Sequence, residues 1–137
     1  MAGLRFGYLV GATKWIRRLD AYTRLNVSNV ALAAASASLG DEDFVSRSIR
    51  SNRRGKSMLY QTLDALKVPY LPSETNFVMF KVTGGLADFR QRMAASEVQV
   101  GRPFPPLLEY CRVTIGLPEE METFCELLRD FRGRRWI

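Results

Sequence analysis

The sequence predicts an α/β chain, more closely an α+β domain, in which helices cover a small and mainly antiparallel sheet. Two kinds of segment support this prediction. Segments 76–82 and 111–115 are rich in β-branched and aromatic residues, which favour strands. Segments 42–66 and 118–131 carry apolar residues at the spacing of one helix face. With 137 residues and 47% hydrophobic content, the chain can bury one modest core, so we expect one principal domain.

The N-terminal part is expected to contain one strand and two helices. Residues 4–10 lie between glycines and have the composition of a short strand. A short helix is predicted from Thr13 to about Leu19. An alanine-rich helix is predicted over Val30–Leu39, with Ser28 as its cap and Gly40 at its C-terminal end.

The longest helix is predicted from about Glu42 to Leu66, and Pro69 prevents it from continuing. Gly55 lies in the middle of this helix. Glycine in a helix interior costs about 1 kcal/mol relative to alanine, so we expect a bend or a close contact at Gly55.

The C-terminal part is expected to add the rest of the sheet. Strands are predicted at 76–82, near Val98–Val100 and at 111–115, with a short helix around 86–93 and a closing amphipathic helix over 118–131. The three strands should form one sheet covered on one face by the closing helix and the long helix. Residues 4–10 should lie outside this sheet.

Alternation within segment 111–115 assigns its side chains to two faces. Val113 and Ile115 should face the helices, and Arg112 and Thr114 should point away from them.

Composition narrows the chemistry that this chain can perform. Only Cys111 and Cys125 are present and histidine is absent, which excludes a zinc finger and a histidine-based triad, and we expect no metal site. We interpret both cysteines as small apolar residues. The net charge of +6 comes mainly from arginine, which suits anionic small molecules as well as nucleic acid.

No apolar run approaches the roughly 20 residues of a membrane span and no signal peptide is recognisable, so a cytoplasmic protein is expected.

Four motifs occur in order along the chain: Met1-Ala2-Gly3-Leu4-Arg5-Phe6-Gly7-Tyr8, Asn26-Val27-Ser28, Asn76-Phe77-Val78, and the run from Cys111 to Glu120. Together they resemble the C-terminal part of fold-type I, pyridoxal-phosphate-dependent aminotransferases of class I/II, closest to the histidinol-phosphate aminotransferase branch. The resemblance implies that residues 1–27 are a remnant of the large cofactor-binding domain, including the strand at 4–10. It implies that residues 28–137 are the small domain.

The resemblance also implies roles for two arginines. Arg5 matches an arginine that contacts the phosphate of pyridoxal 5'-phosphate, where a guanidinium fork meets a dianion. An arginine exposed at a strand edge is the alternative. Arg112 matches the arginine that holds the α-carboxylate of the substrate. A structural salt bridge is the competing interpretation of Arg112.

Two further residues are candidates for substrate binding. Arg102 would favour an anionic group on the substrate side chain, but Gly101 separates it from Val100, whereas the family often has valine directly before this arginine. Otherwise Arg102 is a loop arginine beside prolines. Asn76 would orient groups at the site, and a turn or cap at the start of a strand is the alternative.

The family needs a lysine that holds the cofactor covalently and moves protons during transamination. The family spacing places this lysine four residues before Met1, and none of Lys14, Lys56, Lys67 or Lys81 has the matching context. No residue is therefore assigned a catalytic role, and the chain alone is predicted to be inactive.

For the whole enzyme, the resemblance implies transfer of an amino group between an amino acid or amino-alcohol phosphate and a 2-oxo acid. It also implies a homodimer without a membrane partner.

The alternative is a basic, non-enzymatic module that binds nucleic acid or a partner protein. Arg47, Arg50 and Arg54 share a face of the long helix and motivate that alternative. Aromatic residues do not interleave with these arginines as stacking on bases requires, so we do not expect a nucleic-acid partner.

Overall fold

The computed structural model describes residues 2–22 and 26–137. The chain divides into two compact units, Met1–Ser46 and Arg47–Ile137. This division falls inside the long helix. The border between residues 27 and 28 that the resemblance implies concerns the domains of a whole enzyme, and it stays a prediction.

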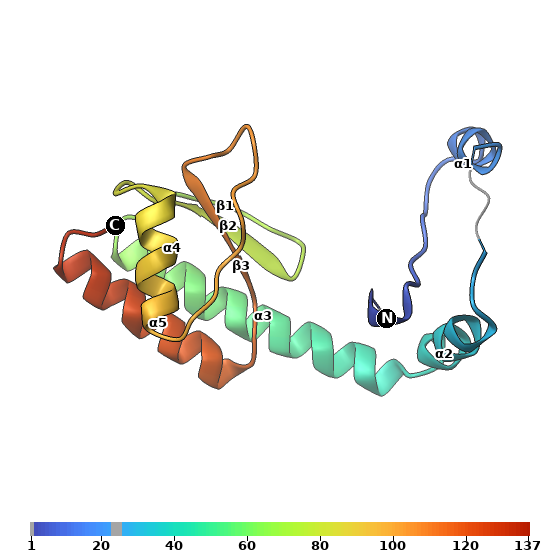
Figure 1. Ribbon diagram of the computed structural model, residues 1–137. Helices are drawn as coiled ribbons and strands as arrows, with labels where there is room; N and C mark the ends of the chain where they lie inside the picture. The colour runs from blue at the N-terminus through green and yellow to red at the C-terminus, as the bar shows by residue number, and fades with distance from the viewer. Residues whose placement is uncertain (1, 23–25) are drawn as a thin grey trace. The chain divides into compact units, whose positions relative to one another are not determined.

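The first unit consists of helices and an extended segment (Figure 1). A 3-10 turn at Ala2–Leu4 is followed by helix α1, Thr13–Asp20, and helix α2, Asn29–Leu39. Both helices lie within one residue of the predicted ranges. Ser28 occupies the N-cap position of α2 as predicted, but its side chain makes no capping hydrogen bond.

The strand predicted at residues 4–10 is wrong, because residues 6–12 form neither helix nor strand. Arg5 adopts a left-handed backbone conformation with φ of 56°, which interrupts an extended path. A strand also needs a neighbouring strand to pair its backbone groups, and the described residues of the first unit provide none. Tyr8 and Val10 are more than 80% exposed here.

The second unit contains one antiparallel sheet in the order β1-β2-β3. Strand β1 is Tyr70–Leu71, β2 is Phe77–Lys81 and β3 is Tyr110–Thr114. In this register Met79 lies opposite Arg112 and Phe77 lies opposite Thr114. As predicted, residues 4–10 take no part in this sheet.

The strand predicted near Val98–Val100 is also wrong, and β1 takes the third place in the sheet. Segment 98–101 runs beside the free edge of β3, where the Gly101 N–H donates to the Arg112 carbonyl at 2.8 Å. Val98 and Val100 are partly buried against the core. Their alternating pattern therefore reflects side-chain packing and not strand pairing.

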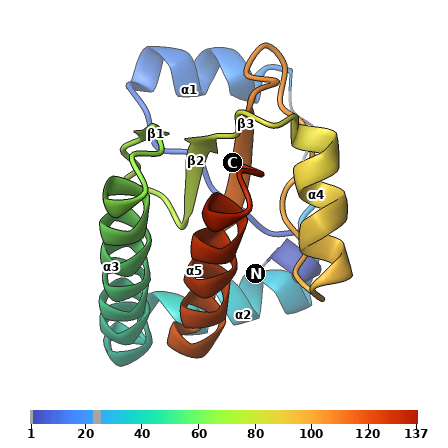
Figure 2. The same cartoon turned by 90° about the vertical axis from the view of Figure 1, so that its left-hand side faces the viewer.

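Helices α3 (Glu42–Ala65), α4 (Leu86–Ala95) and α5 (Pro118–Gly133) cover one face of the sheet (Figure 2). The predicted cover by the long and closing helices is thus confirmed, and α4 adds to it. The core is centred on Phe80, whose ring makes edge contacts with Phe89 of α4 at 5.8 Å and Phe124 of α5 at 6.2 Å. Among the described residues, no helix is both long enough and apolar enough to cross a membrane.

The two faces of β3 differ as the alternation predicts. Cys111 and Val113 are buried in the core, whereas Arg112 is half-buried and Thr114 is exposed on the opposite face. Ile115 is partly buried against the same core as Val113. The faces of this strand are therefore as predicted from the sequence.

Gly55 marks the close approach of α3 to the end of β3. A Cβ atom at Gly55 would lie 2.5 Å from Cγ2 of Ile115 and 3.4 Å from Cγ of Met121. The predicted close contact is confirmed, because a Cβ atom at this position would overlap the Ile115 side chain unless that side chain shifted.

Both cysteines are free and buried, as the interpretation of them as apolar residues requires. Burial raises the pKa of the Cys111 thiol to about 12, although the charge of Arg90 acts in the opposite direction. Burial also raises the pKa of Cys125, opposed by a hydrogen bond with Thr62 and by the charge of Arg129. Both thiols therefore stay protonated at neutral pH.

Candidate anion-binding site

Arg112 is the centre of the candidate site, on the face of the sheet opposite the helices. Its guanidinium carbon lies 5.3 Å from the ring centroid of Phe77 and 4.6 Å from that of Phe104. Its Nε atom is buried and has no hydrogen-bond partner within residues 2–22 and 26–137. A buried donor on a charged group is costly without an acceptor, so this side chain is suited to receive an anion.

Gly101 brings the neighbouring loop against Arg112. A Cβ atom at Gly101 would lie 2.7 Å from the Arg112 carbonyl oxygen and 3.1 Å from the Arg112 Cβ. The position needs glycine because the loop backbone contacts the strand backbone here. The inserted glycine that separates Val100 from Arg102 therefore has a structural reason.

Arg102 reaches the same place as Arg112. Its guanidinium carbon lies 4.5 Å from the ring centroid of Phe104, the ring that Arg112 also contacts. Arg102 is exposed, whereas Arg112 is half-buried. The two arginines that the resemblance placed at the substrate thus meet at one aromatic ring.

Sequence reasoning missed Phe104, although a signal for it exists. It is the aromatic residue in the irregular loop between the two arginines, flanked by Pro103 and Pro105. The loop turns back directly after it, because the Leu107 N–H donates to the Phe104 carbonyl at 2.7 Å. The position of the ring therefore depends on a local turn, and no periodic pattern in the sequence predicts it.

The charge of the site is not neutralised by acidic side chains. In the described part of the chain, the ion pairs are Lys81–Glu109 and Arg134–Asp130, and neither involves Arg102 or Arg112. The salt bridge that competed as an interpretation of Arg112 is therefore not present among these residues. Two guanidinium groups without acidic partners can bind a carboxylate or a phosphate by charge-assisted hydrogen bonds.

Asn76 lies at the bend before β2 and is exposed. Its backbone carbonyl accepts a hydrogen bond from the Ile115 N–H at 2.8 Å, which joins the ends of β2 and β3. This backbone role agrees with the structural alternative for Asn76. A direct role of its side chain in orienting a ligand stays a prediction.

Arg5 belongs to the first unit, Met1–Ser46. Its side chain is exposed, and it forms no ion pair with any acidic side chain among the residues described. An exposed guanidinium without an acidic partner has the right chemistry for a phosphate group.

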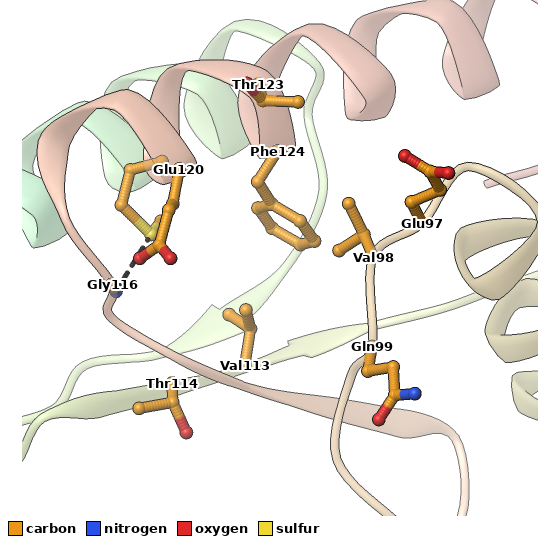
Figure 3. Close-up of a pocket in the computed structure, with 10 residues that line it drawn as sticks. Glu97, Val98, Gln99, Val113, Thr114, Gly116, Glu120, Thr123 and Phe124 are labelled. Carbon is orange, nitrogen blue, oxygen red and sulfur yellow. Dashed lines mark hydrogen bonds between the residues drawn. The ribbon is translucent and has the colours of Figure 1, made fainter.

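A separate open groove of about 460 Å³ lies between segment 97–99, the end of β3 and the start of α5 (Figure 3). Val98 and Phe124 face each other across it. Glu120, which also lines the groove, accepts the Leu117 N–H at 2.7 Å and so caps α5. None of the predicted site residues lines this groove, so it is distinct from the arginine site.

These observations define a class of structure: an α+β unit that carries two arginines at one aromatic ring on the open face of its sheet. The chain belongs to the aminotransferase class I and II family, whose family model matches residues 1–128. The resemblance drawn from the four motifs is therefore confirmed.

Two curated relatives illustrate the branch. The chain is 35% identical over 133 residues to a histidinol-phosphate aminotransferase of Bacillus cytotoxicus, which covers 95% of this chain and 36% of that protein. It is 37% identical over 134 residues to histidinol-phosphate aminotransferase 1 of Cupriavidus pinatubonensis, with 93% and 35% covered. The chain thus spans about a third of the length of these relatives.

Solved structures share the fold. A protein from Erwinia carotovora atroseptica, provisionally named a histidinol-phosphate aminotransferase, superposes with a TM-score of 0.88 at 38% identity and covers 100% of this chain and 40% of its own. Aspartate aminotransferase from Thermotoga maritima superposes with a TM-score of 0.67 at 19% identity, covering 88% of this chain and 32% of its own, which shows a common fold alone.

Proposed function

We propose that this chain is the C-terminal, substrate-binding part of a pyridoxal-phosphate-dependent aminotransferase. The whole enzyme would transfer an amino group between an amino acid or amino-alcohol phosphate and a 2-oxo acid. The observation that carries this proposal is the meeting of Arg102 and Arg112 at Phe104 without an acidic partner among the described residues. Membership of the aminotransferase family supports it.

Arg112 would bind the anionic group next to the reacting carbon of the substrate. Its place in β3 fixes the direction of the side chain, so a bound anion would hold the substrate in one orientation. Arg102 would bind the same group or a second anionic group, as its contact with the same ring allows. Asn76 would orient substrate groups from the neighbouring end of β2.

Pyridoxal 5'-phosphate, when bound, supplies the carbonyl group that receives the amino group and the electron sink that the transfer needs. The exposed guanidinium of Arg5 fits the phosphate of this cofactor, because it carries a permanent charge and lacks an acidic partner in the described residues.

Three of the four lysines contact other groups of the described residues. Lys56 donates to the Ser73 carbonyl at 2.7 Å, and Lys81 pairs with Glu109 at 3.1 Å. Lys14 lies 5.5 Å from the ring centroid of Trp15. We assign none of them to covalent binding of the cofactor, and we propose that the chain by itself does not transaminate.

We further propose a homodimer for the whole enzyme. Several large apolar side chains of the first unit are exposed, including Tyr8, Val10 and Tyr22, each more than 80% exposed. Such side chains are suited to burial against further protein.

The roles of Arg5 and Arg112 can be separated in a chimera that joins this chain to the N-terminal remainder of the Bacillus cytotoxicus relative. Arg5→Ala should weaken the binding of pyridoxal phosphate, and Arg112→Ala should chiefly raise the KM of the amino-acid substrate. Each change removes a charge-assisted contact of about 1.5–3 kcal/mol, so each effect should be about 10- to 100-fold.

Arg90→Ala is the control, because Arg90 is an exposed arginine on α4 outside the site. It should leave both constants unchanged. If Arg5→Ala and Arg112→Ala weaken cofactor binding equally, the assignment of roles is wrong.

A further inference from the structure

We propose that Phe104 is a positioning residue, which holds the guanidinium groups of Arg102 and Arg112 together as one anion-binding unit. The inference rests on the proposed function, because it assumes that these arginines bind an anionic substrate group.

The ring of Phe104 is shared by the two arginines. The guanidinium carbons lie 4.5 Å and 4.6 Å from its centroid, well inside the distance of about 6 Å at which cation–π attraction acts. Two like charges repel each other when no anion lies between them. The attraction of each guanidinium to the ring opposes that repulsion, so each cation keeps its place at the ring before a ligand arrives.

The loop restricts where the Phe104 ring can lie. Phe104 is half-buried, and the turn to Leu107 fixes its backbone. Gly101 holds the start of the loop directly against the Arg112 backbone. The loop that carries the ring is therefore anchored on the strand that carries Arg112.

Holding the two arginines at one ring should increase affinity for an anion. Free arginine side chains sample many rotamers, and binding must restrict them. With the ring present, much of this restriction precedes binding. Removing the ring while retaining an apolar side chain should weaken anion binding about tenfold, since two cation–π contacts are lost.

The test uses this chain, labelled with 15N, and follows the Nε–Hε signals of Arg102 and Arg112 during titration with inorganic phosphate. Sodium chloride keeps the ionic strength constant. In the wild type, both signals should shift along one saturation curve. Phe104→Leu should raise the apparent Kd about tenfold, whereas Phe104→Tyr, which keeps the ring, should stay within about twofold.

Phe77→Leu is the matched control, because the Phe77 ring contacts Arg112 but not Arg102. It removes one cation–π contact where Phe104→Leu removes two, so it should raise the apparent Kd less than Phe104→Leu does. If Phe104→Leu loses the amide dispersion of the folded chain, Phe104→Met replaces it in the same titration.

The outcomes separate the two proposals. An unchanged Kd in folded Phe104→Leu or Phe104→Met, with a normal wild-type titration, overturns the positioning role and leaves the anion site intact. A wild type whose arginine signals do not respond to phosphate overturns the anion site itself, and the positioning role with it.

Discussion

Replacement of Gly55 by alanine tests the close approach of α3 to Ile115, the residue that follows β3. Alanine gains about 1 kcal/mol of helix propensity over glycine. Against this, the new Cβ would lie 2.5 Å from Cγ2 of Ile115, which is far inside ordinary contact. Overpacking of this kind costs about 1–3 kcal/mol. We therefore expect Gly55→Ala to lower the free energy of unfolding by about 1 kcal/mol.

The second half of the experiment removes the atom that causes the clash. In an Ile115→Ala background Cγ2 is absent, so Gly55→Ala should instead raise stability by up to about 1 kcal/mol. The coupling between the two changes should be about 2 kcal/mol. Gly133→Ala at the end of α5 has no atom within 4 Å and should be neutral or slightly stabilising.

The assay is urea denaturation followed by far-UV circular dichroism. A loss of 1 kcal/mol should move the midpoint by about 0.5 M, since m is about 1–3 kcal/mol/M for small proteins. Gly55→Ala that is as stable as the wild type, or equal effects in both backgrounds, would refute the reasoning from the Ile115 contact.

Three further predictions concern the buried core. Because burial raises the pKa of Cys111 to about 12, the folded thiol stays neutral while the unfolded thiol ionises above about pH 9, so stability should fall as pH rises from 9 towards 12. Cys111→Val should reduce this slope, and equal slopes in urea titrations of the two proteins would contradict the pKa argument. Cys111 and Cys125 should react with a thiol reagent at pH 8 at least tenfold more slowly than in urea, and rapid labelling of the native chain would show that the thiols are accessible. Leu63→Ala should lower the free energy of unfolding by about 2–5 kcal/mol because Leu63 is fully buried. A loss below about 1 kcal/mol in urea denaturation would place Leu63 outside the core.

The helices could be predicted because their signals are local. The sequence predicts the long helix from Glu42 to Leu66, and it ends at Ala65, after which Lys67 adopts a left-handed φ of 55° and turns the chain before Pro69. The closing helix begins at Pro118 as expected. In both, one apolar face repeats over several turns, so a single misread residue does not change the result.

The edges of the sheet could not be predicted with the same rules. Strand β1 has only two residues, and the Tyr70 ring stacks on Tyr60 of α3 at 4.7 Å, a contact between distant segments. Val98 and Val100 alternate like a strand but only pack against the core. Strand pairing depends on partners elsewhere in the chain, which local composition does not reveal.

The candidate site was partly predictable. Alternation in β3 placed Arg112 on the open face, and the family resemblance selected it. The contact of Arg102 and Arg112 with Phe104 arises in an irregular, proline-rich loop, where no periodic pattern exists. Gly101 departs from the family pattern, and its close contact with the Arg112 backbone explains why glycine is needed there.

The most direct test of the account is a crystal structure of the chimera with a bound amino-acid or phosphate-containing substrate analogue. We expect anionic oxygens of the analogue within about 3 Å of the Arg112 guanidinium nitrogens, with both Arg112 and Arg102 beside the ring of Phe104. An analogue bound elsewhere, with Arg112 paired to an acidic side chain of the protein, would contradict the account.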